Sequence, residues 1–269
     1  MSMLKTLIAI DADLASGLAI RYACQLSKRM TMELRTIHVH EPDEQGQSPG
    51  TGWVRQTWEE TVVRINQDKI TRMVKTEKAT CPDLEDPKVV SGERDMQILH
   101  ELQLNRYDLL VEGILHAFEP DGFLKKIDSS LYQNLPCPVL LVKNLVSLEK
   151  GILLLGGEEE LMMCMPIFFK IFKEVPFAPD LLCCQFSKKE SSREAKELQH
   201  SKVIVQELEE TLSVQGKTSG NIRTIRGTPT SLSPYVQDYG LVISPAPKVK
   251  SPLADLLSRS PSPMLLCRF

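Results

Sequence analysis

The chain has 269 residues, of which 42% are hydrophobic and 25% are charged, and its formal net charge at pH 7 is -3. This composition is typical of a folded globular protein, and the small net charge indicates neither a nucleic-acid-binding surface nor a polyanionic tail. Charged residues interrupt each apolar run before it reaches bilayer length, so we expect no membrane partner. The apolar stretch before Asp11 is too short for a signal peptide, and the expected location is cytoplasmic.

Strands and helices are predicted to alternate through the first half of the chain. The continuous apolar run from Thr6 to Ile10 ends at Asp11 and is typical of a strand that is buried on both faces, as in parallel sheets. Further strands are predicted over 33–40, 88–90, 108–111 and 136–143, and helices over 15–29, 55–75, around 98–99 and within 114–134. The alternation predicts right-handed crossovers and a doubly wound parallel sheet.

The second half repeats this pattern. Strands are predicted over 151–156, 180–186, 221–226, 240–244 and 264–267, and helices over 161–172 and 194–214. The clearest internal match is between the segment LPCPVLLVK at 135–143 and the segment SPSPMLLCR at 260–268. We therefore predict an α/β protein with two tandem, doubly wound, five-stranded parallel sheets flanked by helices, in domains 1–145 and 148–269.

The two final strands are apolar edge candidates. An exposed apolar edge strand promotes aggregation unless it is paired. We therefore expect the final strands of the two halves to lie together, so that the halves pack as a pseudo-dimer within one chain.

The seven cysteines form no Cys-x-x-Cys motif, and most lie within apolar runs. This favours reduced, structural thiols. The adjacent pair Cys183 and Cys184 leaves a redox-sensor function open as a third interpretation. Neighbouring side chains of a strand point to opposite faces, which disfavours a disulfide between these two residues.

No catalytic or metal-binding spacing is present in the sequence. His38 and His40 share one face of a predicted strand, but no third ligand lies at a recognisable spacing, so no metal site is predicted. The motifs of serine hydrolases, zinc proteases and Walker-type phosphate loops are absent. We therefore expect that the protein is not an enzyme.

Three segments together resemble a universal stress protein domain. They are the opening strand that ends at Asp11, the segment YDLLVEG at 107–113 and the segment PCPVLLVK at 136–143. The resemblance covers the whole first half, and it extends to the second half through YGLVI at 239–243 and the ending at 260–268. It implies a Rossmann-like fold of the adenine nucleotide alpha hydrolase type, in a tandem two-domain member of the family.

In the nucleotide-binding branch of that family, an Asp after the first strand lies on the adenine side, and glycines after the fourth strand surround the ribose and phosphates. Backbone N–H groups at a helix N-terminus hold the phosphate there. The positions of this chain that match the pocket are Asp11, Val39 with His40, Gly113, His116, Lys125 and Lys126. Only one motif glycine is retained, so the resemblance implies a degenerate nucleotide site.

Asp11 has two possible roles. As the last residue of a buried strand, it lies at the sheet edge where doubly wound folds bind ligands. It could instead cap the following helix, a role that Asp13 could also fill.

The second half departs further from the nucleotide-binding pattern. Gly156 stands in place of the Asp, and Pro245 and Pro247 remove N–H donors from the turn after the fourth strand. We expect no nucleotide in this half. The resemblance implies a non-catalytic, stress-response regulatory or protein-interaction module that needs no cofactor and has other proteins or a second copy of itself as partners. The alternative is a switch that binds ATP or another adenine nucleotide in the first domain only.

Overall fold

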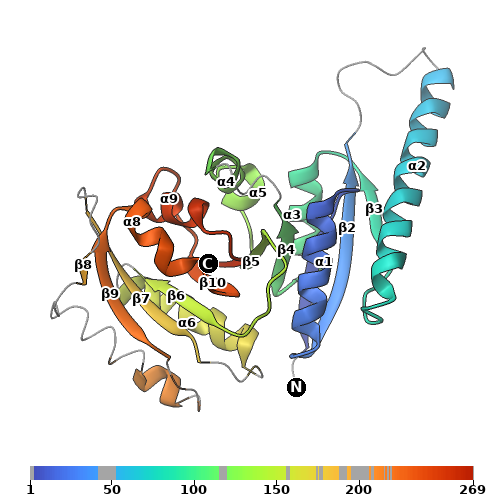
Figure 1. The fold of residues 1–269 in the computed structure, drawn as a ribbon. Helices are drawn as coiled ribbons and strands as arrows, with labels where there is room; N and C mark the ends of the chain where they lie inside the picture. Colours follow the sequence, from blue (N-terminus) through green and yellow to red (C-terminus); the bar gives the residue numbers. More distant parts are fainter. Residues whose placement is uncertain are drawn as a thin grey trace.

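The structure is a computed structural model (Figure 1) that describes residues 3–41, 53–114, 120–155, 158–173, 175, 178–187, 193–194, 206, 209–214, 216, 218 and 220–268. The strands are β1 (Leu4–Ala9), β2 (Met32–His40), β3 (Lys88–Ser91), β4 (Leu109–Gly113), β5 (Val139–Val142), β6 (Gly151–Leu155), β7 (Asp180–Phe186), β8 (Arg193–Glu194), β9 (Ile222–Gly227), β10 (Leu241–Pro245) and β11 (Met264–Cys267). The helices are α1 (Leu14–Ser27), α2 (Trp53–Lys78), α3 (Arg94–Asn105), α4 (Pro120–Ile127), α5 (Ser130–Gln133), α6 (Glu158–Phe172), α8 (Pro229–Leu232), the 3-10 helix η2 (Ser233–Val236) and α9 (Pro252–Arg259). This alternation confirms the predicted α/β class.

The described strands form one continuous sheet in the order β3-β2-β1-β4-β5-β11-β10-β6-β7-β9-β8. Read outward from its centre, the second half repeats the strand order of the first half. The two predicted five-stranded sheets are thus merged into one, and the short β8 adds an antiparallel strand beyond β9. Helices cover both faces: α1, α2 and α6 pack on one, and α3, α4, α5, α8 and α9 pack on the other.

The two halves meet where β5 pairs with β11. This pair is antiparallel, with Leu140 opposite Leu265, whereas the neighbouring pairs β4–β5 and β10–β11 are parallel. The predicted pairing of the two final strands is therefore confirmed. Each apolar edge supplies the backbone partners that the other lacks, so neither is left exposed. As a result, the end of the chain lies in the middle of the molecule (Figure 1).

Two cysteines differ from the prediction that all are reduced. Cys24 of α1 and Cys81, just after α2, form a disulfide with a Cα–Cα distance of 5.7 Å. The expectation of reduced thiols is wrong for this pair, because the fold brings together residues separated by 57 positions. Cys183 and Cys184 are buried and not disulfide-bonded, and they pack on opposite faces of the sheet, as expected.

In the part of the chain that the structure describes, no helix combines the length and apolar character that a membrane crossing requires.

Candidate functional site

A cleft of about 690 Å³ opens at the carboxyl ends of β1 and β4. Its described lining residues are Ala9, Asp11, Asp13, Ala15, Ser16, Arg94, Glu112, Gly113, Ile114, Asp121, Gly122, Lys125 and Lys126. Doubly wound sheets bind ligands at this edge. The cleft brings together four predicted site residues, Asp11, Gly113, Lys125 and Lys126. The fifth, Val39, is buried in the core near the end of β2 and is not among these lining residues.

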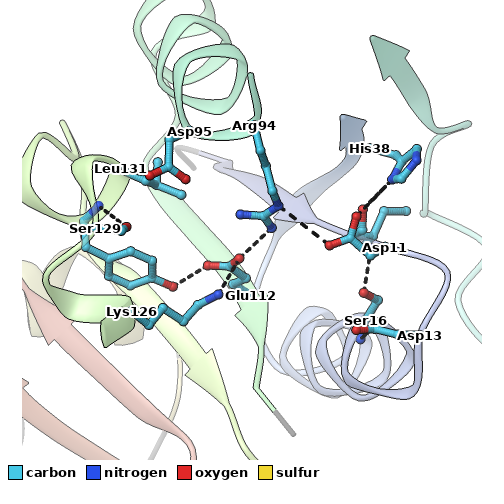
Figure 2. A network of polar contacts seen from close by, with 12 residues as sticks. Asp11, Asp13, Ser16, His38, Arg94, Asp95, Glu112, Lys126, Ser129 and Leu131 are labelled. Atoms are coloured by element: carbon cyan, nitrogen blue, oxygen red, sulfur yellow. Dashed lines mark hydrogen bonds and ion pairs between the residues drawn. The ribbon is translucent and has the colours of Figure 1, made fainter. Parts of the chain in front are cut away.

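Asp11 and Asp13 have separate roles at the start of α1. Asp13 is the helix cap, because its Oδ1 accepts a hydrogen bond of 2.8 Å from the backbone N–H of Ser16. The backbone N–H of Asp11 donates to Oγ of Ser16 at 2.7 Å. The Asp11 carboxylate is therefore not used as the cap, and it turns toward the side chains of the cleft (Figure 2).

His38 of β2 holds the Asp11 carboxylate from one side. Its Nδ1 lies 3.2 Å from Asp11 Oδ1 and 3.0 Å from the carbonyl oxygen of Ile10. The hydrogen bond to Asp11 raises the pKa of His38 against the opposing effect of burial. Burial on its own would raise the pKa of Asp11, but His38 and then Arg94 outweigh it, so the pKa of Asp11 is lowered.

Glu112, near the end of β4, is the centre of a buried ionic network (Figure 2). Its side chain is 3% exposed, and its Oε1 lies 2.6 Å from Nη2 of Arg94 and 2.7 Å from Nζ of Lys126. The hydroxyl of Tyr132 donates to Oε2. Burial opposes the charge of Glu112, but Lys126 and Arg94 outweigh it and lower the pKa of this carboxyl group.

Arg94 connects the two carboxylates, because its Nε lies 3.7 Å from Asp11 Oδ2. It is the first residue of α3, which Glu93 caps by accepting hydrogen bonds from the N–H groups of Asp95 and Met96. Asp95 in turn accepts hydrogen bonds from Ser130 and from the backbone of Leu131 at the start of α5. The N-terminus of α3 therefore positions both Arg94 and α5, the helix that carries Tyr132.

The charges of the cleft largely neutralise one another. Its described lining has the carboxylates of Asp11, Asp13, Glu112 and Asp121, and the cations of Arg94, Lys125 and Lys126. Arg94 and Lys126 both contact Glu112, whereas Lys125 is exposed. The predicted phosphate contact of Lys126 would therefore compete with an ion pair inside the protein.

Gly113 is required by packing where β4 passes the start of α1. A Cβ atom at this position would lie 2.0 Å from the carbonyl oxygen of Ala15. The one motif glycine that the first half retains thus has a structural reason that involves no ligand. The next motif position, His116, lies outside the described residues.

In the corresponding turn of the second half, residues 245–247 offer no free backbone N–H group. Pro245 and Pro247 have no N–H group, and the N–H of Ala246 donates to the carbonyl oxygen of Cys267 at 2.8 Å. Gly156, the other predicted departure in this half, lies outside the described residues.

The two histidines of β2 have different partners. His38 pairs with Asp11, and Nδ1 of His40 lies 3.2 Å from the side-chain nitrogen of Asn66. Within the described ranges, no group of three or more His, Cys, Asp or Glu side chains could hold a metal ion.

Sequence reasoning missed Arg94, Glu112 and Tyr132. The visible signal was the charged Glu112 at the end of an otherwise apolar strand, which requires a partner when it is buried. The identity of the partners depends on where α3, α4 and α5 end on the sheet, and no spacing in the sequence shows this.

Comparisons with known proteins agree with this architecture. A profile described as the universal stress protein family matches residues 3–143. A universal stress protein structure from Archaeoglobus fulgidus is similar over 98% of both chains, with a TM-score of 0.67 and 12% identity. A universal stress protein described as putative, from Pseudomonas aeruginosa, covers 99% of this chain and 93% of its own, with a TM-score of 0.58 and 14% identity. No curated protein matches the chain.

Proposed function

The chain belongs to the universal stress protein family, and on this basis we propose that it is a non-catalytic tandem member whose first-half cleft holds an internal ion-pair network where a nucleotide would otherwise bind. It would act in the stress response as a cytoplasmic regulatory or protein-interaction module. The proposed domains are 1–145 and 148–269, and they meet at the β5–β11 pair.

The neutralisation of Arg94 and Lys126 by Glu112 is the observation that supports this proposal most strongly. A triphosphate would have to draw at least one of these cations away from a carboxylate that has almost no contact with water. Removing the partner of a buried charge costs about 3–5 kcal/mol, and the cation that stays with Glu112 offsets part of this cost. This cost opposes nucleotide binding, and the only other cation of the described lining, Lys125, is exposed and screened by solvent.

Two large apolar side chains beside the cleft support a protein partner. Leu14, at the start of α1, is 63% exposed, and Met96, in the first turn of α3, is 68% exposed. Both lie in the first turn of a helix that begins at the cleft, and their exposed apolar side chains are available for contact with a partner protein or a second copy of the chain.

Mass spectrometry of the small molecules released when the purified full chain is denatured tests the proposal. We expect no stoichiometric adenine nucleotide. Recovery of about one nucleotide per chain would contradict the proposal, provided that dialysis of the folded protein does not remove it.

The alternative is an adenine-nucleotide switch in the first half, and one observation favours it: Asp11 is not the helix cap and faces the cleft. A nucleotide would then lie between Asp11 and Gly113, with its phosphates toward Lys125 and Lys126. Since Lys126 already pairs with Glu112, binding would be weak, about millimolar or −4 kcal/mol, and would decrease with salt.

Calorimetric titration of ATP at low and high salt tests the alternative. Replacing Lys125 and Lys126 together with Ala should abolish such binding, and Asp11→Ala should lower the preference for adenine. Binding that these three substitutions leave unchanged would contradict a nucleotide site in this cleft.

A further inference from the structure

A second cavity, of about 380 Å³, lies where the two halves meet. It adjoins the carboxyl ends of β10 and β11 and the amino end of β5, because β5 and β11 are antiparallel. Its volume is within the range of about 300–1,000 Å³ that is usual for small-molecule sites. Both halves contribute walls, so the cavity exists only when the final strands are paired.

The walls of this junction cavity are mainly aliphatic. The first half contributes Ile127, Leu135 and Val139, and the second half contributes Val249 and Leu266. Four of these five side chains are at most 6% exposed, so the apolar wall is almost fully shielded from the open surface. Such a wall suits an apolar chain.

Two residues of the turn at the rim offer no free backbone donor. Pro247 has no N–H group, and the N–H of Ala246 is already bonded to Cys267. The rim therefore differs from the glycine turn that the family resemblance implies for a phosphate site.

The charged side chains of the described lining are two cations, Lys248 and Arg268. Lys248 is exposed at the rim. Arg268 is partly exposed, and its Nη2 contacts the amide oxygen of Gln133 at 3.3 Å, a neutral partner that leaves the guanidinium charge in place. An anionic head group could therefore approach Arg268 without displacing a carboxylate from it, and Lys248 is part of the same lining.

We propose that the junction cavity binds an aliphatic carboxylate, with its tail along Ile127, Val139 and Leu266 and its carboxylate at Lys248 and Arg268. Such a ligand has an apolar tail and one charged end, which match the apolar walls and the cationic rim of the cavity. The proposal does not depend on whether the first-half cleft holds a nucleotide.

Calorimetric titration of the full chain with decanoate, below its micelle concentration, tests the proposal. We expect saturable binding at one site per chain. Decyltrimethylammonium, with the same tail and the opposite charge, should bind at least tenfold more weakly. The double variant Lys248→Gln with Arg268→Gln should lose at least tenfold in decanoate affinity, whereas Lys28→Gln with Lys69→Gln, on the exposed surface of the first half, should not.

Variants with a larger side chain in the cavity test the same site, because they block the space that the tail would occupy. Ala246→Phe and Met163→Phe each place a ring in the cavity, from the turn after β10 and from α6. Each variant that keeps the wild-type melting temperature should lose decanoate binding. Absence of saturable binding to the wild type, equal binding of the two head groups, or unchanged binding to a folded filled variant would overturn the proposal.

Discussion

Asp11 and His38 show how one side chain can be assigned to a role only after its neighbours are placed. The sequence left Asp11 between a helix cap and a ligand contact, and the hydrogen bond from Ser16 to Asp13 decides that Asp13 is the cap. Asp11 instead pairs with His38, whose Nδ1 lies 3.2 Å away. His38, considered with His40 as a possible metal ligand from the sequence alone, is thus the partner of a carboxylate.

This pair predicts a pH dependence of stability. Asp11 raises the pKa of His38, so the folded state holds its proton more tightly than the unfolded state. The resulting stabilisation is complete below the unfolded pKa of about 6.5 and is lost as the pH rises through the higher folded value. Urea unfolding between about pH 5 and pH 9 should show that the stability advantage of the wild type over His38→Gln falls as the pH rises. Comparing the two proteins cancels the opposing contribution of the buried Lys143, whose pKa burial lowers to about 7. The exposed His100→Gln is the control; an advantage that does not change with pH would contradict the assignment.

Gly113 gives a second test at the scale of one residue. The added methyl group of Gly113→Ala would collide with the Ala15 carbonyl, so we expect a loss of about 1–3 kcal/mol in the free energy of unfolding. Gly17→Ala is the matched control, because nothing lies within 4 Å of a Cβ there, and in a helix this change should be neutral or stabilising. Equal stability of the two variants in urea unfolding would show that β4 and α1 can separate without cost.

At the scale of secondary-structure elements, two contacts join α1 to the end of α2. Arg21 pairs with Glu77 through Nε and Nη2, with an Nη2–Oε1 distance of 2.7 Å. One turn further, Cys24 and Cys81 form the disulfide. Both contacts connect positions more than 50 residues apart, which explains why no local spacing in the sequence indicated them.

Reduction of the disulfide should destabilise the fold. A cross-link that closes a loop of this length usually contributes about 2–4 kcal/mol, mainly by restricting the unfolded chain. Urea unfolding of the wild type with and without dithiothreitol should show this difference. A variant with Cys24→Ser and Cys81→Ser should be insensitive to the reductant, and a wild type that is equally insensitive would contradict the bond.

Across the whole molecule, the fold class and the joining of the halves through their final strands were accessible from the sequence. The apolar strand pattern and the repeated ending at 135–143 and 260–268 predicted the fold class and the β5–β11 pair. The merging into one sheet follows from that pair. The ionic network was not accessible, because Arg94, Glu112, Lys126 and Tyr132 come from four different elements whose ends meet only after packing.

Lys143 is a further contact between the halves. Its buried Nζ, at the end of β5, donates hydrogen bonds to the carbonyl oxygens of Leu257, Ser258 and Ser260 at the end of α9, at 3.0, 3.4 and 2.8 Å. Burial lowers the pKa of Lys143 to about 7. Lys143→Met leaves these acceptors without their donor and should lower the free energy of unfolding by about 1–3 kcal/mol. The exposed Lys150→Met is the control, and equal unfolding curves for the two variants would contradict a role at the junction.

The most direct test of the central claim is a calorimetric ATP titration of the wild type and of Glu112→Gln. We expect no measurable binding to the wild type, and measurable binding to Glu112→Gln, because Arg94 and Lys126 lose the carboxylate that neutralises them. Glu101→Gln is the matched control: Glu101 is also buried and ion-paired, with Nζ of Lys88 at 2.5 Å, but it does not line the cleft. Tight ATP binding to the wild type, or a folded Glu112→Gln protein that binds no more ATP than Glu101→Gln, would show that Glu112 does not keep nucleotide out of the cleft.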